Sequence, residues 1–162
     1  MPNQSAEEDK KAWIYSLRVL NVAAKSRRQM SERLKEKGYS DEVAVRVLTE
    51  LEKLGYLNDR QFAQSLFSQL TRLKSCGRSK IVFELKRKGL PEETWEPLLK
   101  EYSDDDEYAQ GLEIARRKWR SANLIEIAKR KKKVHDFLIR KGYSFQLAFR
   151  ILTTVSQAGE EL

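Results

Sequence analysis

The sequence predicts an all-α protein made of three tandem three-helix repeats, helix-turn-helix-like in plan, that form an elongated, curved stack of about nine helices. Apolar residues recur at intervals of three and four along most of the 162-residue chain, and no stretch alternates with a period of two. Hydrophobic residues make up 40% of the chain, which is enough to bury a core. The seven glycines and three prolines are few for a turn-rich β-sandwich or barrel.

One segment recurs three times and supplies the repeat. Its copies align without gaps at residues 30–48, 81–99 and 134–152. A glycine stands at the same place in each copy, namely Gly38, Gly89 and Gly142. Such a glycine is typical of the left-handed residue that ends a helix. The predicted organisation is a flexible N-terminus, three repeats and a C-terminal tail, at residues 1–10, 11–54, 55–103, 104–157 and 158–162.

Each predicted helix has an apolar stripe at helical spacing. The first helices of the three repeats are predicted from Trp13, Leu17, Leu20 and Ala24, from Phe62, Leu66, Leu70 and Leu73, and from Tyr108, Leu112, Ala115 and Trp119. The second helices are predicted from Met30 and Leu34, from Ile81 and Leu85, and from Val134 and Leu138. The third helices are predicted from Val43, Val47 and Leu51, from Trp95, Leu98 and Tyr102, and from Leu147, Ile151 and Val155.

Polar residues predict where several helices begin. Capping boxes are expected at Ser26 to Gln29, Asp104 to Glu107 and Asn123 to Glu126. Ser40 and Ser144 are expected to cap third helices, and Pro91 to take a first helical position. The third repeat is seven residues longer than the second, and we expect this insertion to lengthen its first two helices by about one turn each.

Positive charge gathers on the second helices. The net charge is +8, and residues 116–141 hold eleven Lys or Arg against two acids, whereas residues 91–107 hold eight acids and one Lys. If the repeats stack, the second helices would form a basic surface. Such a surface could follow phosphates or meet an acidic protein, or it could simply keep a helical protein soluble.

Several classes of site find no support in the sequence. One cysteine and one histidine cannot build a Cys/His zinc site, and one cysteine cannot form an intramolecular disulfide. The acids at residues 104–107 are better explained as helix caps than as a Mg²⁺ site, and Trp13, Trp95 and Trp119 as core than as stacking platforms. We therefore expect no metal, no cofactor and no catalysis. With no apolar run of membrane length and no signal peptide, a cytoplasmic location is expected.

Two consecutive stretches resemble a known family. The run from Gly55 to Ala63, GYLNDRQFA, is similar to the GYLDDxxFA signature of the RecX recombination regulators, with Asn58 in place of the first Asp. The stretch from Gly77 to Leu90 resembles that family's G-xxx-I-xx-EL-xx-KG-I pattern. Residues 26–38 and 137–144 resemble its other repeats more loosely. The matching residues, which we interpret mainly as linker, cap and core, are Gly55, Tyr56, Leu57, Asp59, Phe62, Ala63, Gly77, Ile81, Leu85, Lys88 and Gly89.

The resemblance implies a non-enzymatic regulator of the RecA recombinase. Family members are thought to bind the RecA filament on single-stranded DNA and to limit its recombinase, ATPase and co-protease activities in DNA repair and the SOS response. The protein would be a monomer that touches DNA weakly or within the filament. The exposed bases expected to make contact are Arg27, Arg28, Arg33, Lys35, Arg78, Lys80, Arg87, Lys129, Arg130, Lys132, Lys133 and Arg140.

Two other functions remain open at this point. The first is a stand-alone, basic, helical nucleic-acid-binding protein that acts through phosphate contacts without RecA. The second is a helical adaptor that binds an acidic protein unrelated to recombination. Tight, salt-sensitive DNA binding without RecA would favour the first, and no dependence on DNA would favour the second.

Overall fold

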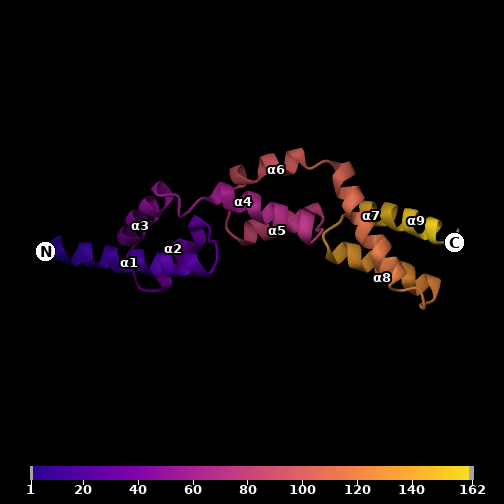
Figure 1. The fold of residues 1–162 in the computed structure, drawn as a ribbon, viewed down its shortest axis with the longest axis horizontal. Coiled ribbons are helices and arrows are strands. Elements are labelled where there is room, and N and C mark those ends of the chain that lie inside the picture. The colour runs from indigo at the N-terminus through magenta and orange to yellow at the C-terminus, as the bar shows by residue number, and fades with distance from the viewer. Residues whose placement is uncertain (1, 161–162) are drawn as a thin grey trace. The chain divides into compact units, whose positions relative to one another are not determined.

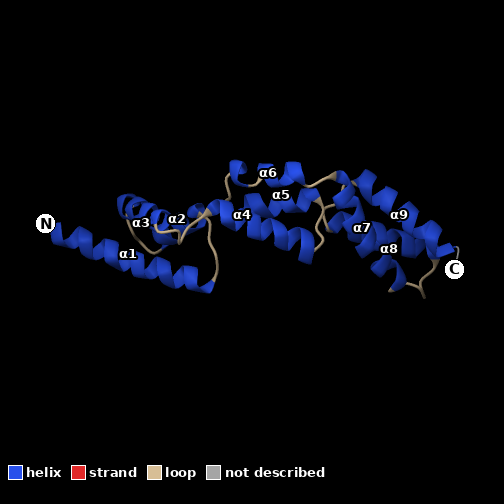
Figure 2. Ribbon diagram, turned by 45° about the horizontal axis from the view of Figure 1, so that its top comes forward, coloured by secondary structure: helices blue, strands red, loops and turns tan. Residues whose placement is uncertain are grey.

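The computed structural model describes residues 2–160, and over these residues it contains nine α-helices and no strand (Figures 1 and 2). The all-α prediction is therefore confirmed for this part of the chain. The helices are α1 (Pro2–Val22), α2 (Arg27–Glu36), α3 (Asp41–Lys53), α4 (Asp59–Ser68), α5 (Arg78–Arg87), α6 (Glu96–Glu101), α7 (Asp104–Arg120), α8 (Ile127–Arg140) and α9 (Phe145–Glu160).

The helices group into two compact units. One consists of Met1–Ser65 with Leu85–Trp95, and the other of Leu66–Glu84 with Glu96–Leu162. The first and third repeats each lie within one unit, and the residues of the middle repeat are divided between the two.

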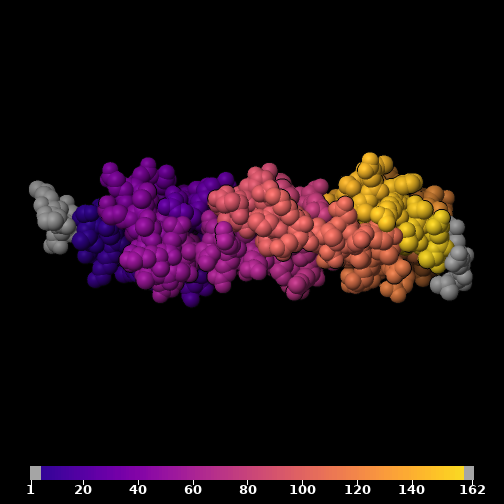
Figure 3. All heavy atoms as spheres, turned by 90° about the horizontal axis from the view of Figure 1, so that it is seen from above, coloured from indigo at the N-terminus to yellow at the C-terminus, as the bar shows by residue number. Residues whose placement is uncertain are grey.

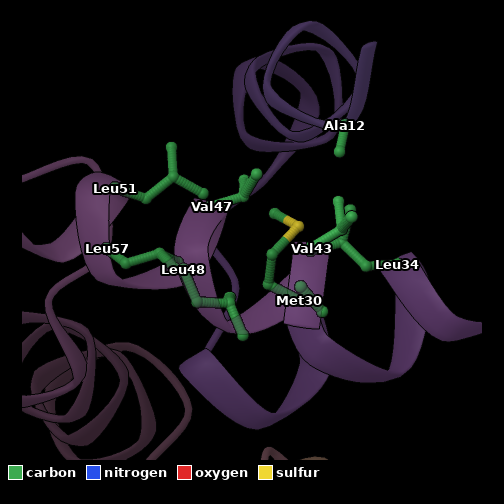
Figure 4. Close-up of a cluster of buried hydrophobic side chains, with 9 residues drawn as sticks. Ala12, Met30, Leu34, Val43, Val47, Leu48, Leu51 and Leu57 are labelled. Carbon is green, nitrogen blue, oxygen red and sulfur yellow. The ribbon is translucent and has the colours of Figure 1, made fainter. Parts of the chain in front are cut away.

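The core of the first unit forms where α1, α2 and α3 meet (Figure 4). Met30 and Leu34, one turn apart on α2, are fully buried, and Val47 and Leu51 of α3 lie in the same cluster. Ala12 and Ser16 are buried residues of α1, and their small side chains let that helix approach closely. The stripes at intervals of three and four thus face inward as predicted for α2 and α3.

The second unit repeats this plan with α7, α8 and α9. Its cluster includes Val134 and Leu138 of α8, Trp119 of α7, and Ile151 and Val155 of α9. Trp119 is 4% exposed, so its prediction as a core residue is confirmed. Helix α9, yellow in Figure 3, lies at the surface with its other face exposed.

Some predicted caps are confirmed and others are displaced. The Ser26 hydroxyl accepts the Gln29 N–H and completes a capping box, and Ser40 caps α3. In α7 the capping box is Ser103 with Asp106, one residue before the predicted pair, because the serine hydroxyl takes the cap position and leaves the acids in the first turn. The box predicted at Asn123 is wrong, since α8 begins only at Ile127.

The N-terminal segment corrects another expectation. Residues 2–10, expected to be flexible, belong to α1, which runs from Pro2 to Val22. Glu and Lys are good helix formers, and the Asp9 carboxylate accepts two hydrogen bonds from the Arg46 guanidinium of α3, at 2.8 and 2.9 Å. At the other end α9 continues to Glu160, three residues into the expected tail. Residue 1 and residues 161–162 lie outside the described residues.

The middle repeat departs most from regular helices. A π-helical turn at Gln69–Leu73 follows α4, and the third helix is divided into a 3₁₀ turn at Glu92–Thr94 and the short helix α6. Pro97 explains the division, because it has no N–H to donate to the turn before it but is tolerated in the first turn of α6. Pro91 takes the cap position directly before the 3₁₀ turn, and not the first helical position that was predicted for it.

The insertion in the third repeat is distributed differently from the prediction. Helix α8 has 14 residues, whereas α2 and α5 have 10 each, so the second helix is longer by about one turn. The first helix hardly changes, because α7 has 17 residues against 10 in α4 plus the 5 of its π-helical turn. The remainder of the insertion lies in the connection at residues 121–126.

Candidate functional site

The candidate site is the set of basic side chains on α2, α5 and α8. In α8 the buried Val134 and Leu138 fix which face meets the core, so Lys129, Lys133 and Arg140, spaced by four and seven, lie together on the exposed face. Among the described residues, no carboxylate lies within ion-pair distance of Lys132, Lys133, Arg140 or, on α2, Arg33. These four bases are therefore the most available for a polyanionic or acidic partner.

Four more of the predicted bases form surface ion pairs. Arg27 pairs with Glu52 at 3.0 Å, Arg28 with Glu32 at 3.5 Å, Lys35 with Asp41 at 2.9 Å and Lys129 with Glu126 at 3.5 Å. All eight side chains are at least 42% exposed, and such pairs contribute only about 0–1 kcal/mol. An acidic group of a partner could therefore replace these carboxylates as the ion-pair partner of the bases, at a small cost in free energy. Lys80 is half-buried, with its ammonium 3.4 Å from the Arg140 carbonyl, and Arg87 is exposed.

Arg78, one of the predicted contact residues, already has partners within the fold. Its guanidinium donates to the carbonyls of Leu99 and Tyr102 at 3.0 and 2.8 Å, and to the carboxylates of Asp104 and Glu107 at 2.9 and 3.2 Å. The planar group with five donors suits such a set of acceptors. Arg78 therefore holds the second unit together.

Arg130, another predicted contact residue, also has partners within the fold. Its guanidinium lies 4.0 Å from the centroid of the Trp119 ring and donates twice to the Trp119 carbonyl, at 2.7 and 2.9 Å. This satisfies a carbonyl at the end of α7, where the helix dipole favours a cation. Arg130 thus packs α8 against α7, while its neighbours in the Lys129 to Lys133 run remain exposed or half-buried.

The second helices meet end to end where consecutive repeats join. In the first unit the Ser26 hydroxyl, before α2, donates to the Lys88 carbonyl, after α5, at 2.6 Å. In the second unit the Gly77 N–H, before α5, donates to the Lys141 carbonyl, after α8, at 2.8 Å. The start of one helix therefore faces the end of the next, an arrangement that the helix dipoles favour.

The repeated glycines make these junctions possible. All three have positive φ, +96° at Gly38, +73° at Gly89 and +91° at Gly142. A Cβ at Gly142 would also lie 2.6 Å from the Lys80 backbone nitrogen, and one at Gly89 would lie 2.8 Å from Arg28 Cζ. A Cβ at Gly38 would have no atom within 4 Å and so lies in open space. The predicted helix-ending role is confirmed, and two of the glycines also permit close approach.

An acid from the following repeat caps each of these helix starts. The Asp59 carboxylate accepts the Arg27 N–H at 2.8 Å, and the Glu107 carboxylate accepts the Arg78 N–H at 2.7 Å. Burial raises the pKa of the Asp59 carboxyl above its usual value; the Arg27 N–H opposes this rise and Glu52 adds to it. The cap of α4 itself is Asn58, whose side-chain oxygen accepts the Gln61 N–H at 2.9 Å.

The described residues offer little for covalent or metal chemistry. No group of three or more His, Cys, Asp or Glu among them could hold a metal ion. Cys76 is buried, and this burial raises the pKa of its thiol, which disfavours the reactive thiolate. None of the helices within residues 2–160 has the length and hydropathy of a bilayer crossing.

Two groups of exposed residues were missed in the sequence. Arg116, Arg117 and Arg120 add exposed positive charge at the end of α7. Phe145 and Phe149 of α9 are 69% and 60% exposed. The sequence did contain a signal for the two phenylalanines. Neither stands at the helical spacing of Leu147, Ile151 and Val155, the apolar stripe that predicted the helix.

Comparisons with known proteins identify the family. Models of the first, second and third three-helix domains of RecX match residues 12–51, 58–99 and 104–152. Regulatory protein RecX of Prosthecochloris aestuarii is 32% identical over 158 residues, 98% of this chain and 97% of that protein. The chain belongs to the RecX family. Regulatory protein RecX of Pelodictyon phaeoclathratiforme is 34% identical over 135 residues, 83% of this chain and 82% of that protein.

Solved RecX structures share the fold. The crystal structure of RecX from Lactobacillus salivarius superposes with a TM-score of 0.78 at 19% identity, over 94% of this chain and 99% of that one. A second crystal structure, of regulatory protein RecX, has a TM-score of 0.75 at 21% identity, over 91% of this chain and 73% of that one. At these identities the likeness establishes the three-repeat fold alone.

The RecX signature in this chain consists mainly of structural residues. Leu57, Ala63, Ile81 and Leu85 are buried, and Tyr56 packs edge-on against Trp13 with ring centroids 5.9 Å apart. Asp59, Lys88 and Gly89 build the junction of the first unit, and a Cβ at Gly77 would overlap the Gly142 carbonyl in the second. The interpretation as linker, cap and core agrees with these contacts.

Proposed function

We propose that this chain is a non-enzymatic regulator that binds the RecA filament on single-stranded DNA and inhibits its recombinase, ATPase and co-protease activities in DNA repair and the SOS response. The observation that carries the proposal is the match of all three repeats, in order, to RecX domains. Relatives named regulatory protein RecX that align over nearly the whole chain support it further. The protein would act as a monomer in the cytoplasm, where RecA and its DNA lie.

The charge of the second helices supports binding as the mode of action. Arg33, Lys132, Lys133 and Arg140 are exposed cations without a described carboxylate partner. A filament of protein on DNA presents acidic side chains and phosphates, both of which such cations attract. Arg78 and Arg130 would act indirectly, by holding the helices that carry these bases.

A titration tests the proposal. RecA's ATP hydrolysis on single-stranded DNA is measured while this protein is added from far below to equal RecA concentration, and binding to the same DNA without RecA is measured at two salt concentrations. We expect hydrolysis to fall at substoichiometric protein, where binding to bare DNA is negligible. No effect until the protein saturates the DNA would contradict the proposal and favour a stand-alone nucleic-acid-binding protein.

A further inference from the structure

The connection between α7 and α8 carries two exposed aliphatic side chains. Leu124 is 96% exposed and Ile127, the first residue of α8, is 48% exposed, so neither contributes to the core of the second unit. The two helices pack against each other, and residues 121–126 join them as a loop at the end of the helix pair, in orange at the lower right of Figure 1. Single exposed apolar side chains are common on protein surfaces, so the meaning of this pair depends on what surrounds it.

Cations surround these two side chains, which we call the aliphatic tip. Residues 116–133 hold nine Lys or Arg against a single acid. Five of the bases are exposed on the two helices next to the tip, and we call them its rim. They are Arg116, Arg117 and Arg120 at the end of α7, and Lys129 and Lys132 near the start of α8. The helix pair is therefore apolar at its end and positive around it.

The rim charge is available to a partner. Among the described residues, no carboxylate lies within ion-pair distance of Arg116, Arg120 or Lys132. The other two rim bases form exposed ion pairs with Glu113 and Glu126, each at 3.5 Å, and such pairs are weak. Helix α8 also begins without a side-chain cap, so the positive end of its dipole adds to the field at the tip.

The spacing between tip and rim fits one leaflet of a lipid bilayer. The polar headgroup layer on each side of the hydrocarbon core is about 5–8 Å thick. At about 1.5 Å per residue, Lys129 lies about 3 Å and Lys132 about 8 Å along α8 from Ile127. With Leu124 at the edge of the acyl chains, the rim cations lie at the depth of the lipid phosphates, and their long side chains can adjust to that depth.

Other polyanions match only part of this surface. Single-stranded nucleic acid would pair its phosphates with the rim, but aliphatic side chains offer its bases no ring for stacking. An acidic protein would need an apolar hollow shaped to the tip, whereas a fluid bilayer accepts any small apolar protrusion. Anionic lipids supply both an apolar phase for the tip and phosphates for the rim.

We propose that the aliphatic tip and its rim bind the surface of a bilayer that contains anionic lipids. Leu124 and Ile127 enter the boundary between headgroups and acyl chains, and the rim cations contact lipid phosphates. The contact is peripheral, in keeping with the finding that no helix within residues 2–160 could cross a membrane. It lies within the second unit and needs neither RecA nor DNA, so it does not rest on the function proposed above.

Binding to vesicles tests the proposal. The full chain is sedimented, without RecA or DNA, with vesicles of phosphatidylcholine alone and with vesicles in which about one third of the lipid is anionic phosphatidylglycerol. We expect binding to the anionic vesicles that weakens as salt is raised, and little binding to the neutral ones. An environment-sensitive dye on Leu124→Cys should shift its emission to the blue on anionic vesicles, and the same dye on Lys53→Cys should not. The native Cys76 is buried, which directs the dye to the new thiol.

A variant of the tip measures the apolar contribution. Leu124→Ser/Ile127→Ser should weaken binding to anionic vesicles about tenfold or more, because the two side chains no longer favour the acyl boundary. The matched control is Val22→Ser/Val45→Ser, at valines of α1 and α3 that are 86% and 54% exposed, and it should bind like the parent.

A variant of the rim measures the electrostatic contribution. Arg116→Gln/Arg117→Gln/Arg120→Gln should weaken binding to anionic vesicles about a hundredfold, since each base near an anionic surface contributes about fivefold. The control Lys11→Gln/Lys53→Gln/Lys100→Gln removes the same net charge from exposed positions on α1, α3 and α6, and should have a much smaller effect. Circular dichroism establishes that every variant is folded.

Two results would overturn the inference. One is a parent protein that does not bind anionic vesicles at low salt. The other is a folded tip variant that binds them like the parent, because the tip would then stay out of the membrane; if that variant also failed to inhibit RecA, the tip would be a filament contact. A tip variant that loses vesicle binding but still inhibits RecA supports the membrane site and leaves the regulatory proposal intact.

Discussion

The carboxylate of Glu107 accepts hydrogen bonds from both the backbone and the side chain of Arg78. One oxygen accepts the Arg78 backbone N–H at 2.7 Å and the other accepts its guanidinium at 3.2 Å. Glu107 lies in the first turn of α7, and Arg78 is the first residue of α5. An acid of the third repeat therefore caps the start of the second helix of the middle repeat. Asp59 makes the same backbone contact with Arg27 in the other unit. The repeats are thus joined by polar contacts as well as by apolar packing.

Removing this carboxylate should strongly destabilise the protein. Glu107 is buried, with 7% of its side chain exposed, so Glu107→Ala leaves a helix-start N–H and a charged guanidinium short of an acceptor. We expect a loss of about 3 kcal/mol in the free energy of unfolding, measured by urea denaturation. The control Glu113→Ala removes an exposed pair with Arg117 on the same helix and should cost less than about 1 kcal/mol. Equal losses of unfolding free energy in the two variants would show that the contact between Glu107 and Arg78 contributes no more than an exposed ion pair.

The repeated glycines allow a comparison between two sites with similar backbone conformation. Gly38→Ala meets only the positive φ, which costs about 1–2 kcal/mol, since the space around it is open. Gly142→Ala should cost several kcal/mol, because the new Cβ would also overlap the Lys80 backbone at the junction. Thermal and urea unfolding of both variants measure the difference. If the free energy of unfolding fell no further in Gly142→Ala than in Gly38→Ala, the junction between α5 and α8 would have room for a Cβ, contrary to this prediction.

Asp59 should give stability a recognisable pH dependence. Burial raises the pKa of its carboxyl, so the folded state binds this proton more tightly than the unfolded chain, whose aspartates titrate near about 3.9. The stability of the parent relative to Asp59→Asn should therefore rise as pH falls through the folded-state pKa, and level off below the unfolded-state pKa. The asparagine oxygen can still accept the Arg27 N–H, so the cap is kept. Urea midpoints of both proteins across this range provide the measurement, and a relative loss on acidification would refute the prediction.

Much of the fold could be predicted because repetition and helical periodicity are local signals. Met30, Leu34, Val134 and Leu138 face their cores as their spacing requires, and the Ser26 and Ser40 caps follow from short-range hydrogen bonding. The prediction failed where a tertiary contact or a single proline determines where a helix begins or ends. Asp9 orders the start of α1 through Arg46, a residue 37 positions away, and Pro97 divides the third helix of the middle repeat.

The contact surface was harder to predict than the fold, because charge in a sequence does not distinguish a structural arginine from an exposed one. Arg78 and Arg130 carry the same charge as Arg33, but their guanidinium groups bind carbonyls that only the folded chain brings near. Phe145 and Phe149 looked like further apolar residues of a helix until their register was compared with the buried stripe.

In the proposed mechanism, exposed bases of the second helices mediate inhibition of RecA. The decisive measurement is RecA's ATP hydrolysis on single-stranded DNA with the variant Arg33→Glu/Lys133→Glu/Arg140→Glu, whose positions are exposed and lack a described carboxylate partner. The control Lys11→Glu/Lys53→Glu/Lys100→Glu reverses as many exposed charges on α1, α3 and α6. We expect the first variant to keep its helicity and lose inhibition, and the control to inhibit like the parent. Full inhibition by the folded first variant would show that these bases do not mediate the inhibition of RecA.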